Sequence, residues 1–207
     1  MDVFYSRNSG NSSRAIFALN EAGAEWIPRP IDPRAGENRA PAYLAVNPMG
    51  KLPALIDGDL LLWESNAINW YVAQKWPQAR LLPASLAGRA AVQRWLFFQT
   101  GHVSPACHPI FRGLPQIQAH WNNAADPAAA AAGRKELARY LPVLEGALTG
   151  RDWLETDFSL ADVAYAPHLM LVGRTGFDFT PYPALRAWLD RLLARPAWQK
   201  TAQLVFG

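Results

Sequence analysis

The sequence predicts a chain in two parts. An α/β part of order β-α-β-α-β-β-α covers residues 1–77, and an all-α helical bundle covers residues 88–207. Short apolar runs alternate with helical periodicity in the first part, whereas the second part shows helical spacing only. Between them lies a stretch rich in proline, with a closing glycine and no periodicity, which is typical of a linker.

The first part contains the signals for a sheet with helices between its strands. Apolar residues at helical spacing begin after Ser12 and stop at Gly23, which favours a helix end. Two apolar runs flank Asp57-Gly58-Asp59, and an Asp-Gly turn in that setting is the strongest hairpin signal in the chain. Ser65 is placed to cap the helix that follows. Strands are expected at residues 3–5, 26–31, 53–56 and 60–63, and helices at residues 12–23, 43–46 and 65–76.

Helical spacing and alanine content predict helices at residues 90–99, 127–148 and 184–194. Ser159 and Asp162 approximate a capping box at the start of another helix, with Asp in place of the usual Glu. The carboxylate would also lie in the first turn, where the helix dipole favours an anion. We therefore interpret this pair as structural and not as a catalytic pair.

Composition excludes several classes of protein. Half of the 207 residues are apolar or aromatic and 18% are charged, which excludes intrinsic disorder. No window approaches about 18 uninterrupted apolar residues, so we expect no membrane span. The chain starts without a basic-then-apolar leader, which favours a cytoplasmic protein. The net charge is +3, but the basic residues stand singly, so we expect no nucleic-acid partner.

Cysteine and histidine usage argues against a metal enzyme. The single cysteine, Cys107, excludes an internal disulfide and a thiolate cluster for zinc or iron–sulfur. The four histidines include no pair at i, i+4. We expect no metal.

Three segments of the first part carry polar groups that suit a binding site. The first is residues 9–14, a loop of hydroxyl and amide side chains between a strand and a helix. Such a loop presents backbone N–H groups at a helix N-terminus, which favours an anion. An ordinary capped turn explains the same residues, and both interpretations stay open.

The second segment, residues 47–53, places Pro53 at the start of a strand directly before the hairpin. A cis X-Pro bond is retained at such places, although Pro53 taken alone is more often a trans strand start. A turned-back peptide at Leu52 would leave its N–H and C=O unpaired by the sheet. These groups would then be available to another extended backbone.

The third segment, residues 63–68, brings an acid and a hydroxyl to a strand–helix junction. Glu64 can accept an ammonium group, while Ser65 and the helix N-terminus can accept a carboxylate. The pair forms a two-point receptor for an amino-acid head group. Helix capping is the structural alternative.

In this order the segments resemble the cytosolic glutathione transferase family over essentially the whole chain. The matching motifs are Lys51-Leu52-Pro53-Ala54-Leu55, Glu64-Ser65 and the capping box of residues 159–162. The resemblance implies a thioredoxin-like N-terminal domain that binds glutathione and a helical domain that contributes the electrophile site. The loop of residues 9–14 is similar to that of bacterial-type classes with a serine or asparagine.

The resemblance also assigns roles to residues of this chain. The backbone of Leu52 would pair with the cysteinyl residue of glutathione, next to a cis Pro53. Glu64 and Ser65 would hold the γ-glutamyl end, and Lys51 would balance the negative charge of the tripeptide. No cofactor other than the co-substrate glutathione is implied.

The thiol of glutathione needs a hydrogen-bond donor, because the thiolate is the nucleophile and a free thiol is mostly protonated at pH 7. Ser9 falls where serine-type classes place their hydroxyl, and Asn11 falls where some bacterial classes place asparagine. Tyr5 lies near the position that other classes fill with tyrosine. We rank Ser9 first, Asn11 second and Tyr5 third.

The implied reaction is conjugation of glutathione to small hydrophobic electrophiles, with reduction of peroxides as a related activity. A homodimer is implied as well, and nine tryptophans are many to bury in one small chain. The rival hypothesis is a non-catalytic ligand-binding or protein-interaction module of the same fold. Candidates for the electrophile site are His102, Cys107, Phe111 and Arg112.

Overall fold

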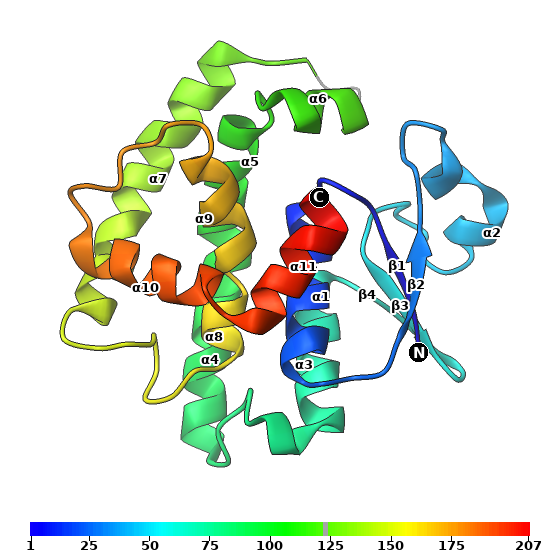
Figure 1. The fold of residues 1–207 in the computed structure, drawn as a ribbon, viewed down its shortest axis with the longest axis horizontal. Coiled ribbons are helices and arrows are strands. Elements are labelled where there is room, and N and C mark those ends of the chain that lie inside the picture. Colours follow the sequence, from blue (N-terminus) through cyan, green and yellow to red (C-terminus); the bar gives the residue numbers. More distant parts are fainter. Residues whose placement is uncertain (122–123) are drawn as a thin grey trace.

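The computed structural model describes residues 1–121 and 124–207. A four-stranded sheet with helices on both faces forms the first part, and helices form the second (Figure 1). The sheet has the order β2-β1-β3-β4, in which β1 is parallel to β2 and antiparallel to β3, and β3 is antiparallel to β4. The strands are β1 (Asp2–Tyr5), β2 (Ile27–Pro30), β3 (Ala54–Asp57) and β4 (Leu60–Trp63).

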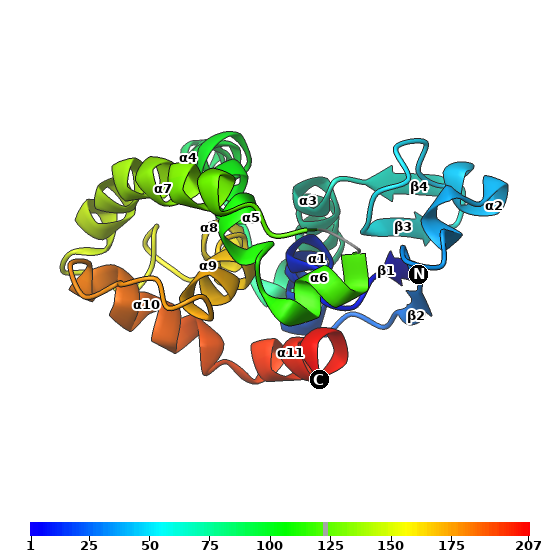
Figure 2. The same cartoon turned by 90° about the horizontal axis from the view of Figure 1, so that it is seen from above.

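The helices of the first part are α1 (Gly10–Glu21), α2 (Pro41–Leu44) and α3 (Ser65–Lys75). Figure 2 shows α1 and α3 between the sheet and the helical part, with α2 on the far side of the sheet. The predicted strands and helices of this part lie within two residues of the observed ones. The fold class predicted from the sequence is therefore confirmed for the α/β part.

One predicted detail of this part is wrong, because Ser65 does not cap α3. It is the first residue of the helix, and the preceding Glu64 occupies the cap position without a side-chain hydrogen bond to the helix. The Ser65 hydroxyl instead accepts a hydrogen bond from Arg14 of α1. A buried guanidinium has more need of acceptors than an exposed helix end, which water can solvate.

Helices account for all regular structure in the described residues of the second part, as predicted. The predicted helix over residues 127–148 coincides with α7, and its N-cap Asp126 accepts a hydrogen bond from Ala129 N. A π-helical turn, Gln99–Val103, joins α4 to α5. The helices are α4 (Leu86–Phe98), α5 (Ser104–Phe111), α6 (Pro115–Trp121), α7 (Pro127–Leu148), α8 (Leu160–Val163), α9 (Ala166–Gly173), α10 (Pro183–Leu193) and α11 (Pro196–Phe206).

The capping box at α8 is present, which confirms the structural interpretation of Ser159 and Asp162. Ser159 N donates to Asp162 Oδ2 at 3.0 Å, and Ser159 Oγ accepts from Ala161 N at 3.2 Å. The buried carboxyl also accepts from Leu154 N and Trp188 Nε1 through Oδ1. Asp162 therefore joins the start of α8 to a loop and to α10.

One hydrophobic core extends through both parts of the chain. Val3 and Leu55 of the sheet belong to the same buried cluster as Leu141 and Trp188 of the helical part. The last helix, α11, returns to pack against α1 (Figure 1). The two parts are thus joined by shared packing as well as by the chain.

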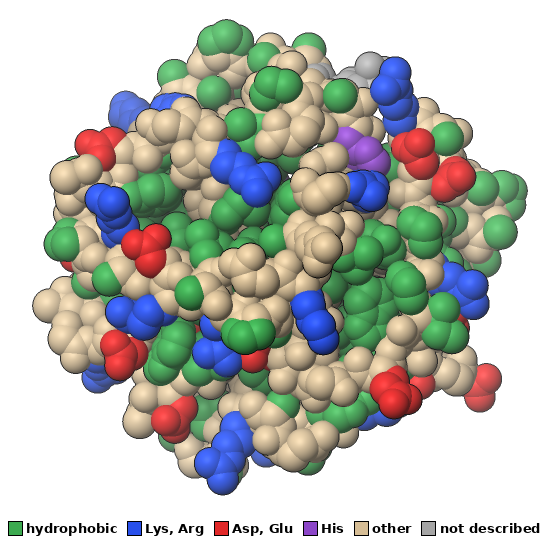
Figure 3. All heavy atoms as spheres, viewed as in Figure 1, with side chains coloured by type: hydrophobic (Ala, Val, Ile, Leu, Met, Phe, Trp, Pro, Cys, Tyr) green, Lys and Arg blue, Asp and Glu red, His purple; other side chains and the backbone are tan. Residues whose placement is uncertain are grey.

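The surface gives no sign of a continuous basic stripe on the face seen in Figure 3. There, Lys and Arg side chains are interspersed with Asp and Glu. None of the helices in the described ranges is long and apolar enough to cross a membrane.

Candidate functional site

A cleft of about 480 Å³ lies between the two parts of the molecule. One wall comes from the β1–α1 loop and from the segment that precedes β3. The other wall comes from α5, from α6 and from the turn between them. The lining residues are Asn8, Ser9, Gly10, Asn11, Pro33, Asn38, Arg39, Gly50, Lys51, Leu52, His108, Phe111, Arg112, Ile117 and Trp121.

Ser9 and Asn11 both line this cleft, at the N-terminus of α1. Ser9 is the N-cap residue, and its Oγ accepts a hydrogen bond from Ser12 N at 3.2 Å. Because the cap uses only an acceptor site, the hydroxyl hydrogen remains available as a donor. Tyr5, the third candidate, is buried against Ile16 and Val205 in a separate apolar cluster.

The segment before β3 is held in place by three hydrogen bonds to its carbonyl groups. Asn38 Nδ2 donates to Gly50 O at 2.8 Å, while Tyr43 OH and Asn47 Nδ2 donate to Lys51 O at 2.6 and 2.7 Å. Gly50 has φ +60°, and a Cβ there would lie 2.7 Å from Asn38 O. Only glycine therefore fits this turn.

The Leu52–Pro53 peptide bond is cis, as the resemblance implied. Leu52 is buried along the cleft, while strand pairing begins only at Ala54. Within the described part of the chain, the N–H and C=O of Leu52 have no backbone partner. This peptide therefore presents one donor and one acceptor to an extended ligand.

Glu64 and Ser65 lie at the start of α3 and do not line the cleft, and Glu64 lines a second pocket, between α3, β4 and α4. Glu64 is exposed and has φ +70°, a left-handed conformation that is unusual for a residue with a side chain. Such backbone outliers concentrate at functional sites, where the surrounding structure maintains them. Ser65 is buried, and its Oγ accepts from Arg14 Nη1 at 2.9 Å.

Arg14 occupies the buried boundary behind the cleft. Its Nε donates to Ala164 O at 2.9 Å, and its Nη2 contacts His168 Nδ1. Burial lowers the pKa of Arg14 to about 9, and burial together with the arginine keeps the pKa of His168 well below its usual value. The imidazole is thus neutral and accepts from the guanidinium. The imidazole ring of His168 lies against Gly10, and a Cβ at Gly10 would lie 3.0 Å from that ring.

The helical wall contains only part of the electrophile site that the sequence suggested. Phe111 and Arg112 line the cleft, and so does His108, which was not predicted. Cys107 is fully buried on the inner side of α5, and His102 is exposed and packs against other aromatic rings on the helical part. Neighbours on a helix point in different directions, which explains why His108 faces the cleft while Cys107 does not.

Charge and burial keep His108 neutral. Burial lowers its pKa to about 4, and the positive charges of Arg14, Arg112 and Lys51 act in the same direction. At neutral pH this side chain therefore offers one donor and one acceptor and carries no charge.

Helix α6 holds the loop that carries Ser9. The ring Nε2 of His120 lies 2.6 Å from the buried Ser6 Oγ, and Trp121 Nε1 lies 3.4 Å from its acceptor, the carbonyl oxygen of Asn8. Sequence reasoning missed these contacts, because a short helix with mixed polarity gives no periodic signal. It likewise missed Asn38 and Arg39, which lie in a polar segment without a motif.

Two family models match this chain. The glutathione S-transferase N-terminal domain matches residues 1–74, and the glutathione S-transferase C-terminal domain matches residues 96–196. The chain belongs to the glutathione S-transferase family. The predictions of the family, of its fold and of a glutathione transferase enzyme are confirmed.

Relatives of this transferase match it along nearly their whole length. The probable glutathione S-transferase GSTF2 of Oryza sativa subsp. japonica is 36% identical, covering 99% of this chain and 97% of the relative. The glutathione transferase F7 structure from Populus trichocarpa has a TM-score of 0.89 at 27% identity, covering 98% and 97%. Glutathione S-transferase-I bound with lactoylglutathione has a TM-score of 0.88 at 30% identity, covering 98% of both chains.

Proposed function

We propose that this transferase binds glutathione in the cleft and conjugates its thiolate to small hydrophobic electrophiles. The observation that carries the proposal is that one cleft contains both a Leu52 peptide without a backbone hydrogen-bond partner in the described chain and the Ser9 hydroxyl at the start of α1. The first suits an extended peptide, and the second suits a sulfur anion. A purely non-catalytic module would need only the first.

The tripeptide backbone pairs in antiparallel fashion with Leu52. Its cysteinyl N–H donates to Leu52 O, and its cysteinyl C=O accepts from Leu52 N. Lys51 and Arg39 lie on the same wall and attract the glycyl carboxylate. The γ-glutamyl end reaches the start of α3, where Glu64 accepts the ammonium group and the N–H groups near Ser65 donate to the carboxylate.

The site must then stabilise the thiolate. An ordinary thiol with a pKa near 8.5 needs about 2.7 kcal/mol of anion stabilisation to lower its pKa by about two units. A hydrogen bond to a charged group contributes about 1.5–3 kcal/mol, and the N-terminus of α1 adds up to about 1 kcal/mol. Ser9 is the proposed donor, with Asn11 as the alternative.

Glutathione-dependent conjugation of an activated aryl chloride tests this proposal. We expect saturation kinetics in glutathione and loss of activity in Lys51→Ala through a raised KM. Reduction of cumene hydroperoxide, measured in parallel, tests the related peroxidase activity. Catalysis no faster than the uncatalysed reaction, despite calorimetric binding of glutathione, would favour the ligand-binding alternative.

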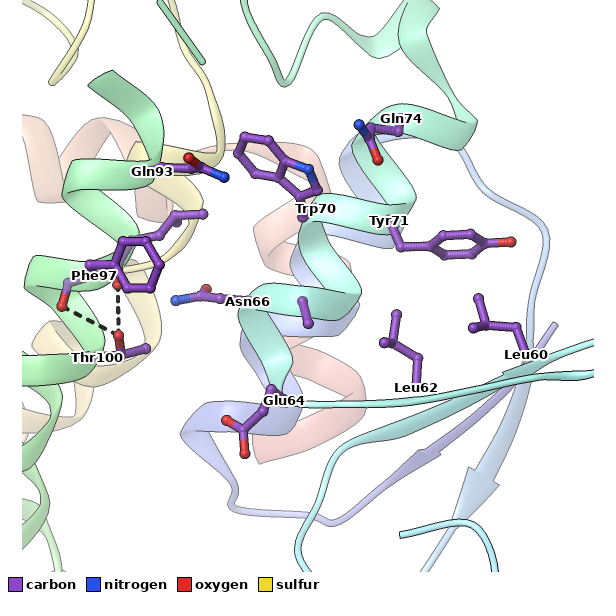
Figure 4. A pocket seen from close by; sticks show the side chains of 12 residues that line it. Leu60, Leu62, Glu64, Asn66, Trp70, Tyr71, Gln74, Gln93, Phe97 and Thr100 are labelled. Atoms are coloured by element: carbon purple, nitrogen blue, oxygen red, sulfur yellow. Dashed lines mark hydrogen bonds between the residues drawn. The ribbon is translucent and has the colours of Figure 1, made fainter. Parts of the chain in front are cut away.

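The transferase is also proposed to be a homodimer. An apolar pocket of about 560 Å³ lies between α3, β4 and α4. Figure 4 shows Asn66 projecting from α3 toward Phe97 and Trp70 projecting toward Gln93, both on α4. Phe97 is 72% exposed, an unusual state for a phenylalanine beside an apolar hollow. A two-fold axis would place each Phe97 against the pocket of the other subunit, because isologous interfaces are self-complementary.

Light scattering tests the dimer. We expect a mass of about 46 kDa, twice the 22.9 kDa of one chain, and half of that for Phe97→Glu. A single chain at micromolar concentration in the unmodified protein would contradict it.

We place this activity in the cytoplasm. A single cysteine gives the chain no internal disulfide to maintain, and a reducing compartment supplies glutathione as the thiol. Cell fractionation of the untagged protein tests this placement.

A further inference from the structure

The charges of the cleft are of one sign. Arg39, Lys51 and Arg112 line it, and among the described residues of its lining none is Asp or Glu. Glutathione with an ionised thiol carries two carboxylates, one thiolate and one ammonium group, so it uses much of this positive charge. The position of each cation decides whether it contacts bound glutathione or the bound electrophile.

Two of the three cations belong to the glutathione wall. Lys51 immediately precedes Leu52, and Arg39 is tied to the same segment because its Nη1 donates to Met49 O at 3.3 Å. Arg112 comes from the opposite wall, where it follows the last residue of α5. The six ion pairs of the described part of the chain do not include Arg112.

The surroundings of Arg112 are apolar and aromatic. Phe111, Ile117 and Trp121 line the same side of the cleft, and the neutral His108 adds hydrogen-bonding capacity without charge. Arg112 is thus the one full charge on the helical wall, within the described lining residues. An unpaired guanidinium beside aromatic rings is suited to a flat ligand that bears an anionic group.

We propose that the preferred electrophile is an aromatic compound carrying a carboxylate or a similar anionic group, which Arg112 binds. This inference rests on the proposed function and specifies its second substrate. In the reaction with an aryl chloride, the thiolate sulfur forms a bond to the ring carbon that bears chlorine. Chloride then leaves with the bonding electrons, the thiol proton having passed to solvent beforehand. Arg112 orients the ring and takes no part in the bond changes.

Two electrophiles of the same shape isolate the charge: 4-chloro-3,5-dinitrobenzoate and 4-chloro-3,5-dinitrobenzamide. For each, kcat/KM is divided by the uncatalysed rate constant with glutathione. We expect this normalised kcat/KM to be larger for the carboxylate than for the amide in the unmodified protein. The ratio of the two values should fall about tenfold in Arg112→Gln, because one charge-assisted contact is lost. Added NaCl should reduce the ratio as well, since salt screens exposed charges.

Arg151→Gln serves as the matched control, because Arg151 is also an exposed arginine of the helical part and lies outside the cleft. Its ratio should equal that of the unmodified protein. An Arg112→Gln ratio equal to that of the control would overturn the inference while leaving the proposed function intact.

Absence of turnover with both electrophiles would contradict the proposed function instead. Calorimetry with the two pre-formed glutathione conjugates then tests the inference separately. Selective loss of affinity for the carboxylated conjugate in Arg112→Gln supports it, and equal affinities in both variants overturn it.

Discussion

Arg14 Nη1 donates a 2.9 Å hydrogen bond to Ser65 Oγ, so an arginine of α1 fixes the first residue of α3. The same guanidinium donates to Ala164 O, which directly follows α8. One side chain therefore links both helices beside the sheet to the helical part. Its planar group serves several acceptors at once, which a lysine ammonium on a flexible stem does not reproduce.

Arg14→Lys should lower the free energy of unfolding by about 2–4 kcal/mol, because buried acceptors lose their donors. Urea denaturation measures this loss. Arg151→Lys, at an exposed position, should change it by less than about 0.5 kcal/mol. Equal stability of the two variants would mean that the buried network contributes little.

Ser9→Ala should lower kcat by about one to three powers of ten, because one charge-assisted hydrogen bond is worth about 1.5–3 kcal/mol. The pH–rate profile should move about one unit or more toward higher pH as the pKa of the bound thiol recovers. Affinity for glutathione should change little, since it rests on Lys51, Leu52 and the start of α3.

Ser9→Gly separates catalysis from helix capping, because glycine at an N-cap costs only a few tenths of a kcal/mol. We expect it to match Ser9→Ala in turnover while remaining more stable. If Asn11→Ala proves the more damaging variant, the role of donor belongs to Asn11.

Asp162 should make stability depend on pH. Burial raises the pKa of Asp162 to about 6 in the folded protein, above the value near 3.9 of an unfolded chain. Between these values the folded state binds more protons, so the free energy of unfolding should fall as the pH rises from about 4 to about 6. Asp162→Asn should be less stable at pH 4 and should lack this pH-dependent component.

The amide oxygen of the Asn variant can still accept from Leu154 N and Trp188 Nε1, but its NH2 group replaces the oxygen that accepts from Ser159 N. Two donors then face each other, which should cost about 2–4 kcal/mol at pH 4. The deficit should shrink toward pH 7, as thermal denaturation across the range would show. A deficit that grows with pH would mean that the hydrogen bonds outweigh burial and hold the carboxyl pKa low.

Cys107 should not react with thiol reagents in the folded protein. It is fully buried, and burial raises the pKa of its thiol above the ordinary range, so almost no thiolate forms even at pH 8–9. 5,5′-Dithiobis(2-nitrobenzoate) should release one equivalent of chromophore per chain in urea and almost none before unfolding. Stoichiometric reaction of the native protein within minutes would contradict this placement.

Much of the α/β part could be predicted from sequence because its signals are local. The Asp57-Gly58 turn fixes a hairpin between two apolar runs, and Ser9 caps the helix that it precedes. The second part was predictable where helices are long or alanine-rich. It was not predictable at α5 and α6, whose limits depend on packing across the cleft.

The residues of the site also differ in how far the sequence predicts them. Ser9 and Leu52 could be predicted because each belongs to a local motif, a helix cap for Ser9 and a cis X-Pro bond for Leu52. Arg39 and Trp121 carry no such signal, since the tertiary fold alone brings them to the cleft. Cys107 and His108 are neighbours on α5, and their local sequence indicates neither the limits of that helix nor which of the two side chains faces the cleft.

The packing of α11 on α1 has a consequence for synthesis on the ribosome. Helix α1 leaves the exit tunnel long before its partner α11, because every other helix of the described chain lies between them in sequence. At a synthesis rate of about 5–20 residues per second, the apolar face of α1 lacks that partner for roughly 10–40 seconds. Arg14 likewise waits for Ala164 and His168 before its buried contacts can form. The α/β part therefore cannot complete its native packing until α11 has left the exit tunnel, and its exposed apolar surface is prone to aggregation during that interval.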